Sequence, residues 1–145
     1  MIQEGAMHKH AYLRAYMAGI VVPTVFLLFA LAGFSIVRFV YRVPVPIERL
    51  MVFPMALVPN LWGLWNMVFV ALHSRRHLPL GIHGALLVFL LVPIGLTLAR
   101  LLDIWIVTPR FIVSVFPIVL PVALVVYYLA WKYVVGFCNE VLGIA

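Results

Sequence analysis

The stretch "AYMAGIVVPTVFLLFALAGFSIV" at residues 15–37 carries no charged side chain and is long enough to cross a bilayer as a helix. A hydrocarbon core about 30 Å thick requires about 20 apolar residues in that conformation. Three further apolar runs are also long enough, at about residues 50–72, 80–102 and 110–135. Their apolar residues lie all round the predicted helices, which is typical of membrane spans. The sequence therefore predicts an all-α integral membrane protein with four transmembrane helices in an up-down bundle.

The composition limits what the chain can be. Hydrophobic residues make up 67% of its 145 residues, charged residues make up 10%, and the mean hydropathy is +1.21. These values lie outside the range of soluble domains, and only short segments remain outside the spans, so residues 1–145 are expected to form a single transmembrane domain. The net charge of +6 comes from Lys and Arg near helix ends, where they meet lipid phosphates rather than nucleic acid.

The two halves of the chain resemble each other at an offset of 61 to 63 residues. The segment "GFSIVR" (33–38) matches "GLTLAR" (95–100), and "RLMVFPMALVP" (49–59) matches "RFIVSVFPIVLP" (110–121). Matches of Arg, Gly and Pro at one offset are informative even in so apolar a chain. We interpret them as the internal duplication of a two-helix hairpin, with one repeat at about residues 14–72 and the other at about 76–135.

Such a duplication predicts how the helices relate to one another. Each repeat contains an even number of spans, so both repeats enter the membrane the same way up and both chain ends lie on one side. The matched glycines Gly33 and Gly95 are expected to let helices approach closely, and Gly19 matches Gly81 at the same offset. We expect a multi-pass protein of the plasma membrane, or of the inner membrane in a bacterium. Lys and Arg are divided equally between the two sides, so the positive-inside rule leaves the orientation open.

The stretch "PNLWGLWN" at residues 59–66 places polar side chains and indoles inside the second span. The apolar segments on either side of it are each too short to cross a bilayer alone, so this stretch is expected near the midplane. Pro59 removes one helical hydrogen bond and predicts a kink. Helical spacing puts Trp62, Trp65, Asn66, Phe69 and His73 on one face, and Asn60, Gly63 and Met67 on another.

These polar side chains need partners, because an unpaired amide or indole N–H in hydrocarbon is costly. In one interpretation they hydrogen-bond a neighbouring helix, or the Met55 carbonyl that Pro59 frees. In the other they line a midplane pocket in which Trp walls and Asn amides contact a ligand. The second interpretation gives the hypothesis for the function, with Asn60, Trp62, Trp65 and Asn66 as the ligand-binding residues.

Five histidines lie on the side that holds the chain ends. His73 and His77 are four residues apart and share a helix face, and His83 begins the next helix. A cluster of neutral imidazoles can bind a transition metal or form a pH-sensing patch, whereas isolated histidines at helix ends do neither. The candidate metal ligands are therefore His73, His77 and His83, and a transition metal is the one cofactor that the sequence suggests.

Arg100 and Asp103 are three residues apart at the end of the third span, which predicts a structural ion pair. Arg38 is the counterpart of Arg100 in the first repeat. No acid stands at the position that corresponds to Asp103, so no ion pair is expected there.

The chemistry that the sequence lacks narrows the function. It contains no buried carboxylate pair, no Ser–His–acid set and no phosphate-binding glycine loop, so enzymatic activity is not expected. The first hypothesis is a protein, expected to be oligomeric, that binds or passes a small apolar or amphipathic molecule at the Trp/Asn site. The alternative is an accessory or scaffold subunit of a larger membrane complex, and a third is a metal-binding or pH-sensing protein. The expected partners are membrane lipids and either a second copy or another membrane protein.

Overall fold

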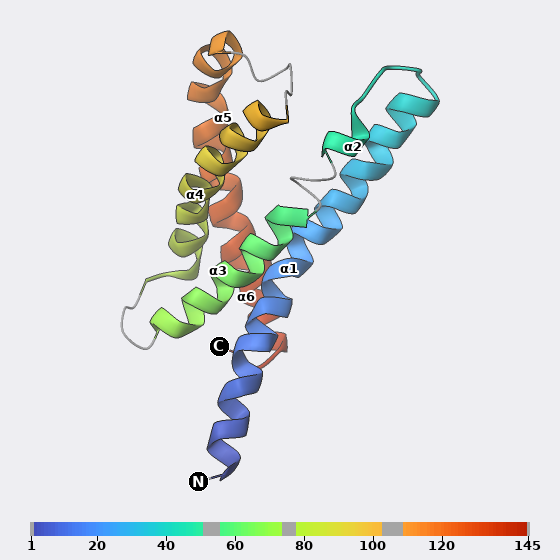
Figure 1. Ribbon diagram of the computed structural model, residues 1–145. Helices are drawn as coiled ribbons and strands as arrows, with labels where there is room; N and C mark the ends of the chain where they lie inside the picture. Colours follow the sequence, from blue (N-terminus) through green and yellow to red (C-terminus); the bar gives the residue numbers. More distant parts are fainter. Residues whose placement is uncertain (1, 51–55, 74–77, 103–108, 145) are drawn as a thin grey trace.

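The computed structural model of the chain describes residues 2–50, 56–73, 78–102 and 109–144. Within these ranges the regular elements are helices, and no strand occurs. The helices, labelled in Figure 1 apart from the π-helix η2, are α1 (Ile2–Phe39), α2 (Ile47–Leu50), α3 (Val58–His73), α4 (Leu80–Leu101), α5 (Pro109–Leu129), η2 (Ala130–Val135) and α6 (Gly136–Val141).

Among the described residues, three stretches are long and apolar enough to cross a membrane. They are His10–Phe39 in α1, Leu80–Leu101 in α4, and Ser114–Val141, which runs through α5, η2 and α6. The helix over Val58–Leu72 is also apolar but shorter. These helices confirm the prediction of an all-helical membrane protein, without its count of four spans. Helices suit a membrane because their backbone groups are hydrogen-bonded within the segment itself.

The second predicted span differs most from the structure. It was expected over residues 50–72, but α2 ends at Leu50 and α3 begins at Val58, and residues 51–55 lie outside the described part of the chain. Pro59 is the second residue of α3. Residues 56 and 57 just before it are π-helical, so an irregular turn stands beside the proline that predicted a kink.

The helices alternate in direction along the chain. In Figure 1, α1 rises, α3 descends, α4 rises, and the continuous helix of α5, η2 and α6 descends again, so that both chain ends lie towards the bottom of the view. The most extensive packing is between α1 and α3 and between α4 and α5. The upper half of α1 diverges from α4 and α5 (Figure 1).

The core lies where α3 and α4 meet the continuous helix formed by α5, η2 and α6, which is called the last helix from here on. Its buried side chains are Trp62, Leu87, Leu91, Trp131 and Val135. Gly84 makes this packing possible, since a Cβ at that position would lie 2.0 Å from Cγ of Trp131. The core is therefore built around a large indole that fits against a glycine of α4.

Close helix approach occurs at the matched glycines Gly19 and Gly81. A Cβ on Gly19 would lie 2.7 Å from the carbonyl oxygen of Trp62, and a Cβ on Gly81 would lie 2.6 Å from the Tyr128 ring. Gly33 was expected to permit close packing, but a Cβ there would meet nothing within 4 Å. That expectation for Gly33 is wrong, because this part of α1 lies away from the other helices.

Candidate functional site

Asn66 lies at a fully buried junction of three helices. Its Nδ2 donates to the carbonyl oxygen of Ala15 in α1 and to Oδ1 of Asn139 in α6, each at 2.8 Å. The Asn139 amide donates in return to Oδ1 of Asn66 at 3.3 Å. Asn66 is 0% exposed and Asn139 is 1% exposed. This reciprocal amide pair is the helix-to-helix bonding that polar side chains provide within membranes.

Trp65 makes a second reciprocal contact, between α3 and α4. Its Nε1 donates to the carbonyl oxygen of His83 at 2.8 Å, and Nε2 of His83 lies 3.0 Å from the carbonyl oxygen of Trp65. The two rings stack, with centroids 4.9 Å apart and planes inclined by 22°. Because Trp65 O can only accept, Nε2 of His83 carries the proton in this arrangement.

Asn60 lies on the more exposed face of α3. Its Oδ1 accepts a hydrogen bond from the Tyr16 hydroxyl of α1, and its Nδ2 donates to the carbonyl oxygen of Ala56. The Met55 carbonyl that was expected as an acceptor lies outside the described residues. Three of the four residues predicted to contact a ligand, namely Asn60, Trp65 and Asn66, therefore have hydrogen-bond partners within the protein.

Trp62 differs from these three residues. It is 4% exposed, and within the described part of the chain its Nε1 has no hydrogen-bond partner. Its ring packs against Tyr127 at a centroid distance of 5.0 Å and against Trp131 at 5.4 Å. Trp62 also lines a cavity of about 300 Å³ whose other lining residues are Val22, Pro23, Phe26, Leu27, Val58, Val126, Tyr127 and Ala130.

The cavity lies at the middle of two spans. Its lining residues in α1 and at the junction of α5 with η2 fall at the centres of His10–Phe39 and Ser114–Val141. Buried side chains form its inner wall, among them Leu27 (8% exposed) and Trp62. Phe26 and Val126 stand at its edge and are 69% and 54% exposed. The structure thus contains an apolar cavity at mid-span, next to one residue of the predicted site.

The predicted histidine cluster lies only partly within the described residues. His83 is buried, with Nε2 directed at a backbone carbonyl and its ring between Trp65, Phe69 and Trp131. The His77 position and the His73 side chain lie outside the described residues. Among the residues that are described, no group of three or more His, Cys, Asp or Glu side chains is placed to hold a metal ion.

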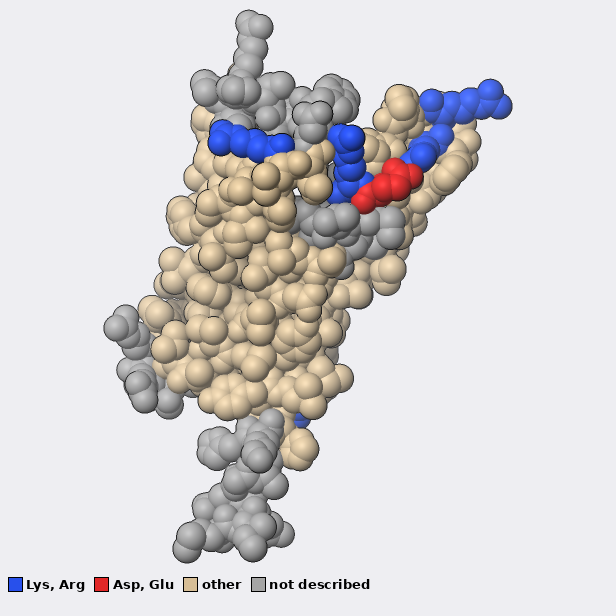
Figure 2. All heavy atoms as spheres, in the orientation of Figure 1, with Lys and Arg blue, Asp and Glu red and all other residues tan. Residues whose placement is uncertain are grey.

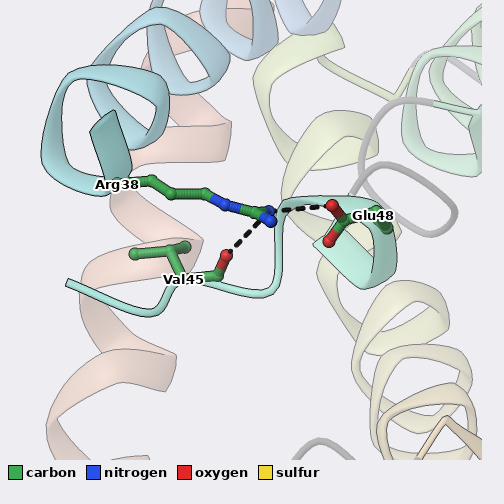
Figure 3. Close-up of polar contacts among 3 residues, drawn as sticks. All are labelled: Arg38, Val45 and Glu48. Atoms are coloured by element: carbon green, nitrogen blue, oxygen red, sulfur yellow. Dashed lines mark hydrogen bonds and ion pairs between the residues drawn. The ribbon is translucent and has the colours of Figure 1, made fainter. Parts of the chain in front are cut away.

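Charged side chains gather at the end of the molecule where α1 and α4 finish (Figure 2). Nη1 of Arg38 donates to Oε1 of Glu48 at 2.8 Å and to the carbonyl oxygen of Val45 at 3.3 Å (Figure 3). The expectation that Arg38 has no acidic partner is wrong, because the loop before α2 returns Glu48 to the end of α1. A hydrogen bond from its own backbone N–H and that from Arg38 lower the pKa of Glu48. Of the predicted pair, Arg100 is exposed and Asp103 lies outside the described residues.

Comparisons with protein-family models, with curated proteins and with solved structures found no match to this chain. The sequence reasoning missed Tyr127, Trp131 and Asn139, which complete the cavity wall, the core and the amide pair. Asn139 gave little signal in the sequence, because it lies beyond the predicted span 110–135 and Glu140 follows it directly.

Proposed function

We propose that this protein binds a small apolar or amphipathic molecule in the cavity between α1, α3 and the last helix. The observation that carries the proposal is the cavity of about 300 Å³ beside Trp62. Ligand pockets begin at about this size and are lined mainly by hydrophobic and aromatic side chains. Of the four residues that the sequence suggested as ligand-binding, only Trp62 is kept in this proposal. The other three already have hydrogen-bond partners within the protein.

The lining favours an apolar ligand over a polar one. Apart from the indole of Trp62 and the phenol of Tyr127, every lining side chain is a hydrocarbon, and none carries a charge. A cavity of about 150 Å³ with apolar walls stays dry and takes up benzene. The cavity here has roughly twice that volume, which suits a ligand segment of about twelve carbon atoms.

For the membrane topology, we propose that α3 forms the fourth crossing. The described helix Val58–His73 alone is about 24 Å long, short of a core about 30 Å thick. Its apolar character and its packing along α1 support a crossing that includes residues before Val58. Cysteines introduced by Arg42→Cys and Leu78→Cys in a Cys138→Ser background test this, since they flank α3. Labelling by an impermeant maleimide from opposite sides supports four crossings, and labelling from one side contradicts them.

Two structural observations support the proposed duplication. Gly19 and Gly81 match in the sequence, and each lies in the first helix of its hairpin against a residue of the second helix. The two most extensive helix contacts, α1 with α3 and α4 with α5, also fall within the two proposed repeats. Residues that match in sequence and occupy similar packing positions are expected of repeated units.

Native mass spectrometry of protein released gently from its own membranes tests the ligand proposal. Leu27→Trp places a larger side chain in the cavity, whereas Leu28→Trp makes the same change at an adjacent position that is 58% exposed and does not line it. We expect a reproducible adduct on the wild type and on Leu28→Trp, and its loss from Leu27→Trp. A wild-type protein without an adduct, or equal retention by both variants, contradicts the proposal. A co-purifying membrane protein in place of an adduct favours the accessory-subunit alternative.

A further inference from the structure

We infer that the occupant of the cavity is the end of a hydrocarbon chain of a bilayer lipid, which enters sideways between α1 and α5. The inference rests on the proposed function and narrows its ligand from any small apolar molecule to the acyl chain of a lipid. Three features support it: the depth of the cavity, the position of its edge, and the chemistry of its lining.

The depth of the cavity matches that of lipid chain ends. The lining residues of α1 lie at the centre of the span His10–Phe39, and those of the last helix lie at the centre of Ser114–Val141. From Leu27 to Arg38, near the end of α1, the helix rises about 16 Å. Half of a hydrocarbon core about 30 Å thick is about 15 Å, so the cavity lies where the chains of one leaflet end.

The edge of the cavity faces hydrocarbon rather than water. The most exposed lining residue of α1 is Phe26, and Val126 of α5 is also more than half exposed. In a membrane, both of these mid-span side chains contact lipid tails. The packing of α1 involves α2, α3, η2 and α6, and its contact with α5 is at most slight. A chain already dissolved in the bilayer therefore reaches the cavity between α1 and α5 without crossing water.

The lining accommodates a chain but not a headgroup. The Nε1 atom of Trp62 is shielded, and no charged side chain lines the cavity. A phosphate or ammonium group within it would lack a compensating charge and would be strongly disfavoured. A volume of about 300 Å³ takes up roughly ten to twelve methylene groups, which is a part of one acyl chain. The headgroup thus remains at the membrane surface while the chain end lies against Trp62.

Fluorescence quenching by brominated lipids tests this inference. The full-length protein is reconstituted into phosphatidylcholine vesicles whose acyl chains carry bromine either near the terminal methyl or near the ester. Subtracting the signal of Trp62→Phe isolates the emission of Trp62 from that of the other tryptophans. We expect the terminal bromine to quench Trp62 at least about twofold more than the bromine near the ester.

Two variants locate the entry point. Val126→Phe enlarges a side chain at the edge of the cavity, and Val125→Phe makes the same change one residue earlier, where the side chain is 58% exposed and outside the lining. We expect Val126→Phe to reduce quenching of Trp62 at least about twofold and Val125→Phe to leave it unchanged. Equal melting temperatures of the two variants exclude an unfolding effect.

The outcomes separate this inference from the proposed function. If Val126→Phe and Val125→Phe show equal quenching of Trp62, or if the terminal bromine quenches no more than the bromine near the ester, the occupant is not a lipid chain. If the native adduct still depends on Leu27 in that case, the cavity binds a different apolar molecule and the proposed function stands. If the adduct is also absent, both fall. Selective quenching that Val126→Phe abolishes supports the lipid chain.

Discussion

The side chains of α3 meet two different environments within the same two turns. At Asn66, three helices meet around a buried amide pair in which each side chain donates to the other. At Trp62, one turn earlier, the indole borders an apolar cavity and its N–H has no partner among the described residues. Both residues are almost fully buried, at 0% and 4% exposure. Burial alone therefore does not distinguish a structural residue from one that borders the proposed ligand site.

The hydrogen bonds and the adjoining cavity together make the distinction. In hydrocarbon, a buried amide with complete bonding fixes neighbouring helices in place, and removing one partner leaves the other uncompensated. A cavity lined by hydrocarbon side chains carries no such constraint, so its walls tolerate substitution and its volume can be occupied. We therefore expect substitutions at the amide pair to affect stability and substitutions at the cavity to affect occupancy.

The largest expected effect is at the amide pair. Asn66→Leu removes the hydrogen bonds to Asn139 and Ala15 and leaves the Asn139 amide buried without them. We expect a loss of about 2–3 kcal/mol in the free energy of unfolding. Unfolding by sodium dodecyl sulfate from mixed micelles, followed by circular dichroism, measures it. In the double variant with Asn139→Leu, the loss should be smaller than the sum of the single losses, and strict additivity would show that the two amides are not coupled.

A smaller effect is expected where α1 meets α3. The Cβ introduced by Gly19→Ala would lie 2.7 Å from the Trp62 carbonyl oxygen, so the two helices must separate. We expect a loss of about 1–2 kcal/mol in the same unfolding assay. Gly33→Ala is the matched control, since its Cβ meets nothing within 4 Å and alanine favours helix. Equal losses for the two variants would argue against close packing at Gly19.

Substitutions of Trp62 and Trp65, the two tryptophans of α3, allow the two environments to be compared directly. Trp65→Phe and Trp62→Phe remove the same atoms, but only the first breaks a described hydrogen bond, the one to the His83 carbonyl. We expect Trp65→Phe to cost about 1 kcal/mol more in unfolding free energy than Trp62→Phe. A greater loss at Trp62 would indicate that its indole N–H has an acceptor, with the Tyr127 hydroxyl as the first to test by Tyr127→Phe.

The smallest expected effect is at the surface, in the Arg38–Glu48 pair. The pKa of Glu48 is lowered in the folded protein, so the pair stabilises the fold above the ordinary carboxyl pKa and loses this effect as the pH falls through the folded pKa. The Glu48 side chain is 74% exposed, which limits the contribution. Unfolding of the wild type and of Glu48→Gln, measured from about pH 6 to about pH 3, should converge in acid. A difference that grows in acid would contradict the sign of the shift.

Hydropathy predicted the helices but not how their faces meet. Runs of apolar residues locate α1, α4 and the last helix, because the thickness of the bilayer fixes how long an apolar run must be to cross it. The partners of Asn66 and Trp65 come from positions 51, 73 and 18 residues away, and no periodicity specifies such pairings. The sequence indicated Gly33 as a site of close helix approach, yet of Gly33 and Gly19 it is Gly19 that lies against another helix. Glu48 was missed because the loop after α1 reverses direction, which the spacing of Arg38 and Glu48 does not reveal.

The most direct test of the contrast between the Asn66 amide pair and the Trp62 cavity measures ligand occupancy and stability on the same samples. Native mass spectrometry and unfolding are applied to the wild type, Leu27→Trp and Asn66→Leu, all prepared from native membranes. Leu27→Trp should lose the bound adduct while its unfolding free energy stays close to that of the wild type. Asn66→Leu should keep the adduct while its unfolding free energy falls. Loss of the adduct from Asn66→Leu with retention by Leu27→Trp would contradict the assignment of ligand binding to the Trp62 cavity.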